Sequence, residues 1–165
     1  MYASNEANGN TSDRELHLTR LFNAPRELVY QAWTDPLHLE HWWVPEGFSI
    51  NSEYISVRPG GSWRFVILGP DGGYYHHEVI FLETVSPDHL VYMHHNHNET
   101  DQCTITLLFT AQDKQTRLNM QLLFPTRAAR DKVLREHATM ESMNQTLDRL
   151  ESLLTKIIHL HYKLK

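Results

Sequence analysis

The hydrophobic and polar positions at the start of the chain predict one strand and two short helices. Residues 15–22 alternate between apolar and polar side chains, as a strand that is half buried does. The triplet 23–25 then predicts a helix start, because Pro25 has the fixed φ that is favoured at a first helical position. The helix is expected over 25–34, with Leu28, Val29 and Ala32 facing inward, and Asp35-Pro36 predicts a second short helix ending near His41.

From Gly47 onward the pattern is typical of strands separated by turns. The strands are expected at 49–57, 62–68, 74–85, 89–95, 103–111 and 116–124. The segments 58–61, 69–73 and 86–88 carry the Pro, Gly and Asp residues of tight turns. Short turns make consecutive strands pair as antiparallel neighbours, so the pattern predicts a meander.

The region after Pro125 predicts one long amphipathic helix over 126–156. Apolar positions recur there every three or four residues and form one stripe: Val133, His137, Met140, Leu147, Leu150, Leu154 and Ile157. A helix with one apolar stripe is expected to cover one face of the sheet, which gives an α+β fold with a curved antiparallel sheet of six to seven strands. The expected division is a disordered leader at 1–13, one domain at 14–156 and a tail at 157–165 that frays or extends the helix.

Composition and charge exclude several classes of protein. The 165 residues suit one domain, and 41% hydrophobic against 21% charged residues is typical of a folded chain. The net charge of -5 argues against a nucleic-acid partner and against a polybasic membrane anchor. No stretch approaches the length of a membrane helix, and the polar N-terminus lacks the apolar core of a signal peptide. With Cys103 as the single cysteine, a reducing, cytoplasmic location is expected.

Several landmarks, in order, resemble one family. The segments 20–29, 32–36 and 42–45 (RLFNAPRELV, AWTDP and WWVP) resemble the opening of START-like proteins related to the C-terminal domain of the activator of heat-shock protein 90 ATPase. The glycine turn RPGGSWRF at 58–65, PDHLVY at 87–92 and QTLDRL at 145–150 resemble later landmarks of that family. The resemblance covers 16–154 and implies a helix-grip fold, which hosts carriers, cyclases, hydroxylase subunits and co-chaperones. Met143 departs from it, since relatives often carry Trp nearby.

The strand alternation predicts which side chains lie under the long helix. On its own this pattern fits a solid core as well as a cavity, and the resemblance favours a partly open interior. In the cavity interpretation, Trp63, Phe65, Tyr75, His77, Phe81, Leu107, Phe109, Met120 and Leu122 come from the sheet, Met140, Met143 and Leu147 from the helix, and Trp42 and Trp43 from the rim. An alternative role for the two adjacent tryptophans is to anchor the short helices to the sheet.

The histidines and the cysteine are candidates for metal binding or catalysis, but the sequence pattern favours neither role. His38 and His41 lack a third ligand nearby, and His94 points to the opposite face from His95 and His97 on a strand, so we expect no metal site. Of the adjacent His76 and His77, one is expected in the cavity and one in solvent. Cys103 is expected to be an inert core thiol. No catalytic residue and no cofactor is assigned.

Three classes of function follow. The first is non-catalytic binding of a small hydrophobic molecule in an internal cavity. The second is a co-chaperone role, binding a chaperone or another protein, which the resemblance implies. The third is a cavity enzyme such as a cyclase. A monomer or a homodimer is expected, with no nucleic-acid and no membrane partner.

Overall fold

The computed structural model describes residues 10–96 and 102–163, and the expected leader residues 1–9 lie outside the described part. The helices are η1 (Ser12–Arg14), α2 (Arg26–Thr34), α3 (Pro36–Trp42), α4 (Arg127–Arg135) and α5 (His137–Lys163). The strands are β1 (Glu15–Phe22), β2 (Ser49–Ile55), β3 (Ser62–Leu68), β4 (Tyr74–Val85), β5 (His89–Asn96), β6 (Gln102–Gln112) and β7 (Gln115–Leu123). The predicted α+β helix-grip architecture is confirmed.

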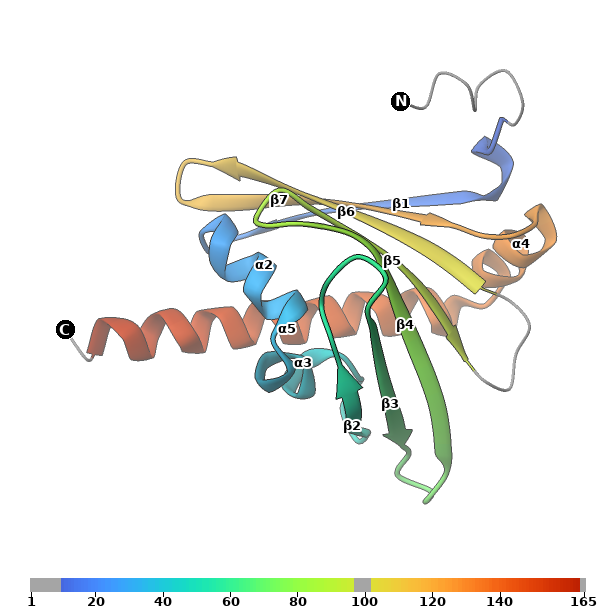
Figure 1. Cartoon of the computed structure of the whole chain (residues 1–165), viewed down its shortest axis with the longest axis horizontal. Coiled ribbons are helices and arrows are strands. Elements are labelled where there is room, and N and C mark those ends of the chain that lie inside the picture. The colour runs from blue at the N-terminus through green and yellow to red at the C-terminus, as the bar shows by residue number, and fades with distance from the viewer. Residues whose placement is uncertain (1–9, 97–101, 164–165) are drawn as a thin grey trace.

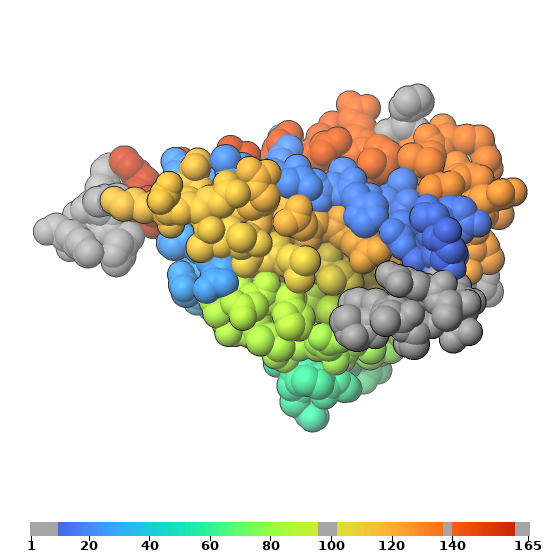
Figure 2. All heavy atoms as spheres, turned by 90° about the horizontal axis from the view of Figure 1, so that it is seen from above, coloured from blue at the N-terminus to red at the C-terminus, as the bar shows by residue number. Residues whose placement is uncertain are grey.

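The strands form one antiparallel sheet in the order β1-β7-β6-β5-β4-β3-β2. The predicted meander therefore runs from β2 to β7, and β1 joins it by pairing with β7. Register shifts in β2 between Ser52 and Tyr54 and in β4 between Phe81 and Glu83 mark bulges, which bend strands and increase twist. The resulting sheet curls around α5, while α2 and α3 lie toward one end of the groove and α4 toward the other (Figure 1). Strands β1, β6 and β7 reach the molecular surface on the opposite side (Figure 2).

The turn between β2 and β3 has a steric requirement for glycine. Gly60 has a φ of +83°, which L side chains rarely adopt. A Cβ on Gly61 would lie 2.1 Å from the backbone oxygen of Ser56, so only glycine fits there. The Gly60 and Gly61 backbones pair with Phe81 on β4, which joins the turn to the neighbouring hairpin.

The long C-terminal helix predicted over 126–156 is two helices. Glu136 breaks it with φ −92° and ψ 86°, and the Glu136 N–H donates to the carbonyls of Lys132 and Val133. The break arises because α4 packs against η1 whereas α5 turns toward α2 and α3. Thr126 caps α4, since its hydroxyl accepts from the Ala129 N–H at 3.0 Å.

Both ends of the expected domain have regular structure. Residues 12 and 13 of the expected leader form a short 3-10 helix with Arg14, which is bound to the end of β7. The Arg14 guanidinium donates to the Phe124 carbonyl at 2.6 Å, and the Phe124 N–H donates to the Arg14 carbonyl at 2.9 Å. At the other end, the expected tail is helical to Lys163 as a continuation of α5. At the first helix, Pro25 is the N-cap rather than the first helical residue.

One interaction fixes the start of α2 against the sheet. Thr116 on β7 is fully buried, and its hydroxyl donates to the Ala24 carbonyl at 2.7 Å. Ala24 and the preceding Phe22 are themselves buried, so water cannot replace this bond. The chain leaving β1 is thereby directed under the sheet, where Val29 and Ala32 enter the core as predicted.

We expect Thr116→Val to lower the free energy of unfolding by about 1–3 kcal/mol, because it leaves the buried Ala24 carbonyl without a donor at unchanged side-chain shape. Thr110→Val, at an exposed position on β6, is the matched control and should change stability by less than about 0.5 kcal/mol. Denaturant melts of both variants measure the difference. Equal stability of the two variants would show that the hydrogen bond does not hold α2 in place.

Candidate functional site

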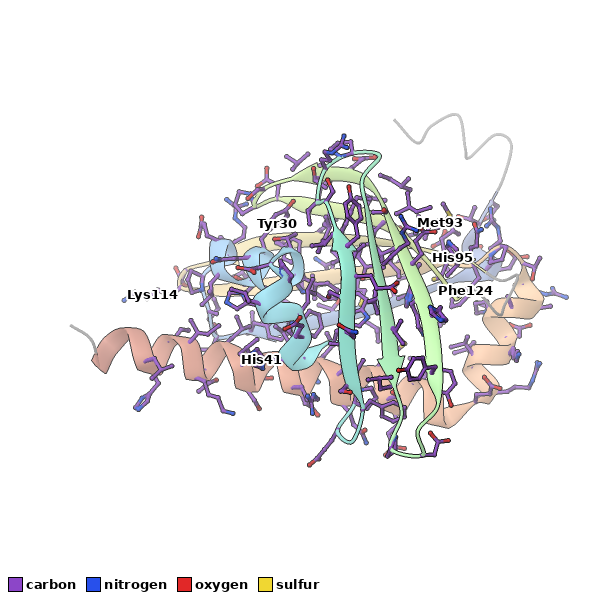
Figure 3. All side chains as sticks on the ribbon, turned by 60° about the horizontal axis from the view of Figure 1, so that its bottom comes forward. Tyr30, His41, Met93, His95, Lys114 and Phe124 are labelled. Carbon is purple, nitrogen blue, oxygen red and sulfur yellow. The ribbon has the colours of Figure 1, made fainter. Side chains whose placement is uncertain are left out.

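A cavity of about 310 Å³ lies between the sheet and the first turns of α5. Strands β3, β5, β6 and β7 supply its sheet wall, and α4 and α5 supply its helical wall. In Figure 3 the lining residue Phe124 lies with Met93 and His95 at the α4 end, away from Tyr30 and His41. The cavity is therefore displaced from the middle of the helix toward the break at Glu136. Its lining residues are Trp33, Trp42, Trp43, Val44, Pro45, Ile67, Tyr92, His94, Cys103, Ile105, Met120, Leu122, Phe124, Val133, Ser142, Met143, Thr146 and Leu147.

Packed tryptophans form one end of the cavity. The ring of Trp42 lies edge-on to Trp33 with 4.6 Å between centroids, and its indole N–H donates to the Ala32 carbonyl at 2.9 Å. Trp43 packs edge-on against both of these rings, at 5.8 Å from Trp33 and 5.5 Å from Trp42, and against Trp63 of β3 at 5.0 Å. Edge-to-face aromatic packing of this kind adds stabilisation beyond the area buried. The adjacent tryptophans thus join the short helices to the sheet and also line the cavity, which combines the two roles weighed from the sequence.

The structure places six of the fourteen predicted site residues in the cavity lining. The sheet contributes Met120 and Leu122, α5 contributes Met143 and Leu147, and the rim contributes Trp42 and Trp43. These side chains come from three separate regions of the chain. Met143, the position that departs from the family's landmarks, stands in the wall.

The other eight lie outside the lining. Five belong to the solid core beside the cavity, with exposed fractions of 0–2%: Trp63, Phe65, Phe81, Leu107 and Phe109. Tyr75 is 37% exposed, because β4 extends there beyond the part of the sheet that the helices cover. Met140 is half-buried outside the lining, and His77 is partly exposed and stacks on Phe65 at 5.3 Å.

The sheet wall also carries the polar ring of His94, which the sequence did not single out for the cavity. His94 shares the inner face of β5 with Leu90 and Tyr92, and this period-two pattern is the signal that could have identified it. The Nε2 atom of His94 lies 3.0 Å from the Nδ1 atom of His77 on β4, in a hydrogen bond between the two rings. Burial, and then the neighbouring His77 and His95, lower the pKa of His94 from its ordinary value of 6.5 to about 3, so the ring is neutral near pH 7.

The other titratable groups of the lining are also held in their neutral forms. Burial raises the pKa of the Cys103 thiol to about 12, and a hydrogen bond with the Leu123 backbone opposes the shift only in part. Burial and then Cys103 raise the pKa of Tyr92 well above its ordinary value of 10. Among the residues that the structure describes, the lining contains no Asp, Glu, Lys or Arg side chain. This described part of the cavity wall is therefore uncharged.

The histidine-rich end of β5 offers no metal cluster among the residues that the structure describes. His95 points away from the cavity, and its Nε2 lies 3.2 Å from Glu78 of β4. Within 10–96 and 102–163, no group of three or more His, Cys, Asp or Glu side chains is placed to hold a metal ion. The remaining candidates from the sequence, His97, Glu99 and Asp101, lie outside these ranges.

Comparison with known proteins gives the family. The Activator of Hsp90 ATPase homolog 1-like protein family matches residues 23–155. The chain belongs to this family. It therefore has the START-like fold, a type of domain that binds ligands or proteins.

Solved structures from several bacteria share this fold. A Rhodobacter sphaeroides protein is 24% identical with a TM-score of 0.81, over 90% of this chain and 97% of its own. A Nitrosomonas europaea protein is 24% identical with a TM-score of 0.79, over 90% and 98%. A Staphylococcus epidermidis protein is 25% identical with a TM-score of 0.78, over 87% and 90%. No curated protein matches the chain. In the part of the chain that the structure describes, no helix combines the length and hydropathy needed to span a bilayer.

The pKa of His94 predicts a loss of stability in acid that begins below about pH 6.5. The unfolded chain binds a proton at His94 near pH 6.5, whereas the folded chain binds it only near pH 3, so stability falls as the pH drops through this window. Near pH 5 this one group costs about 2 kcal/mol, from 1.36 kcal/mol per pH unit. His94→Phe removes this contribution.

Denaturant melts near pH 7.5 and pH 5 measure this effect. The free energy of unfolding of the native protein should fall by about 2 kcal/mol more than that of His94→Phe. The variant controls for the other histidines, which are present in both proteins. Equal losses in the two proteins would mean that His94 accepts a proton readily in the fold.

The Cys103 thiol should resist alkylation in the native protein, because a pKa of about 12 leaves very little thiolate near pH 8. We expect iodoacetamide to modify it at least about 100-fold more slowly than in the guanidinium-unfolded chain. Mass spectrometry gives an unambiguous reading, since the chain has one cysteine. Comparable rates in the two states would contradict the burial of this thiol.

Proposed function

We propose that this protein binds a small apolar molecule in the cavity between the sheet and α5, without covalent chemistry. The observation that carries the proposal is an uncharged, mostly aromatic and aliphatic cavity of about 310 Å³ in a fold type that hosts ligands. Small-molecule sites are usually cavities of about 300–1,000 Å³ lined by apolar side chains with a few polar groups. The site residues are the lining residues, with Trp43, Met143 and His94 at its aromatic, helical and polar walls.

The chemistry of the wall favours binding over catalysis. A cysteine nucleophile needs a lowered pKa, and that of Cys103 is raised to about 12. A general base works best with a pKa near the working pH, and that of His94 is about 3. Its hydrogen-bond partner is another imidazole, His77, and not the carboxylate that orients a catalytic histidine in many enzymes.

The alternative, a co-chaperone role, is supported by the family description alone, because the cavity would have no part in it. The two proposals differ in where binding occurs, within the cavity or on the surface. A cytoplasmic location and a monomeric or dimeric state stay predictions.

Filling the cavity tests the proposal. Met143→Trp places a larger ring in the cavity, so it should change the free energy of unfolding by less than about 1 kcal/mol. It should also abolish binding of N-phenyl-1-naphthylamine, an uncharged apolar probe whose fluorescence rises in an apolar site. Fluorescence titration of the native protein and the variant is the measurement.

Leu107→Trp is the matched control. Leu107 is fully buried in the core and does not line the cavity, so the same enlargement should cost about 1–3 kcal/mol through overpacking. Failure of the native protein to bind the probe, together with an equal destabilisation by both tryptophans, would show that the interior is effectively solid. A surface-mediated role would then be favoured.

A further inference from the structure

The polar atoms of the cavity wall are few, and they are not equivalent. On the helical side, the Thr146 hydroxyl donates to the Ser142 carbonyl at 2.9 Å, so its hydrogen is used within α5. On the sheet side, His94 and Cys103 are cross-strand partners on β5 and β6. Of these two, the imidazole is a strong hydrogen-bonding group and the thiol a weak one. With the Tyr92 hydroxyl, which also stands in the lining, His94 is one of two strong polar anchors that the sheet wall offers.

Within 10–96 and 102–163, one of the two ring nitrogens of His94 has a hydrogen-bond partner. The Nε2 atom pairs with His77, and among the described residues no side chain or backbone group hydrogen-bonds to the Nδ1 atom. The neighbouring rings are Trp43 and Phe65, each with its centroid 6.1 Å from that of the imidazole. His94 is half-buried and lines the cavity, and the two rings beside it are apolar. A polar group in such a place is satisfied when a bound molecule supplies the missing partner.

The wall also limits the charge of that molecule. A carboxylate or ammonium entering the cavity would lose its hydration and would meet no Asp, Glu, Lys or Arg side chain among the described lining residues. Burial in these surroundings, and then the neighbouring His77 and His95, lower the pKa of His94 to about 3. The wall therefore disfavours a positive charge. An uncharged polar group escapes this penalty.

We propose that the ligand is an uncharged molecule with a compact apolar body and one hydroxyl group, and that His94 is the residue that binds this hydroxyl. The inference rests on the proposed function and narrows it to a class of compound, the apolar alcohols and phenols. A hydroxyl fits either arrangement of the histidine pair, because it donates to Nδ1 when His94 Nε2–H donates to His77 and accepts from Nδ1–H in the reverse case. A ketone fits only the second arrangement.

Three compounds with one skeleton test the inference: naphthalene, 2-naphthol and 2-naphthoate. Calorimetric titration of the native protein should show naphthalene binding, and 2-naphthol binding about 3- to 10-fold more tightly through one added hydrogen bond. The charged 2-naphthoate should bind more weakly than naphthalene. In His94→Phe the advantage of 2-naphthol over naphthalene should vanish, whereas naphthalene itself should still bind.

Two further variants separate hydrogen bonding from packing. His94→Asn keeps an uncharged hydrogen-bonding side chain and should retain part of the advantage of 2-naphthol, which a purely structural role would not restore. Met120→Leu changes another lining residue at nearly constant volume and should leave the advantage intact. Should His94→Phe fail to fold, the asparagine variant and a His94→Leu variant supply the same comparison.

The outcomes also distinguish this inference from the proposed function. If naphthalene binds the native protein but 2-naphthol binds no more tightly, or if its advantage survives in His94→Phe, the inference is wrong and apolar binding stands. If neither compound binds the native protein and N-phenyl-1-naphthylamine also fails, the proposed function itself is wrong.

Discussion

The packing of two adjacent tryptophans, which joins the short helices to the sheet, determines how the interior is filled. At the end of α3 the chain places Trp42 against Trp33 and Trp43 against Trp63. The Trp42 N–H is bonded to the Ala32 carbonyl and the Trp63 N–H to the Ser52 hydroxyl, so the rings that bracket Trp43 are fixed by hydrogen bonds as well as packing. The helices are thus held at a set distance from the sheet, and large rings fill the interior at this end.

The cavity depends on the shape of the sheet and on the helix break between α4 and α5. Bulges in β2 and β4 bend the sheet, and the break at Glu136 turns α4 away from the line of α5. Beyond Leu147 the stripe of α5 continues with Leu150 and Leu154, which are buried in the solid core. Before Leu147 it presents Met143 and Ser142, which stand at the cavity. Because the sheet is curved and α5 is straight, the helix packs tightly on the sheet along only one part of the helix. On α5, smaller or more flexible side chains line the part that stays open.

Much of the fold could be predicted from the sequence, because its signals are local. The turn at Gly60 and Gly61 needs glycine for steric reasons, and the alternation of Ile105, Leu107 and Phe109 assigns the inner face of β6 correctly. The division of the inner face between core and cavity could not be predicted in this way. Leu107 and Ile105 share a face and a strand, yet only Ile105 lines the cavity, because the difference depends on where α5 and the tryptophans lie above them. The break at Glu136 was missed for a related reason, since the apolar stripe continues across it and only tertiary packing bends the chain.

The residue most informative about function is His94, whose place in the cavity wall depends on the tertiary structure. A valine or leucine at position 94 would keep the alternation of β5 and would remove the cost of holding an imidazole in an apolar wall. The His77–His94 bond meets only half of the hydrogen-bonding capacity of that ring. Polar groups buried at some cost to stability are common at functional sites, because a fold can spare a few kcal/mol where an interaction with a ligand needs it. The tryptophans, the bulges and the helix break each have a structural reason that is independent of any ligand. The Nδ1 atom of His94 has no hydrogen-bond partner among the described residues, and a molecule that enters the cavity would supply one.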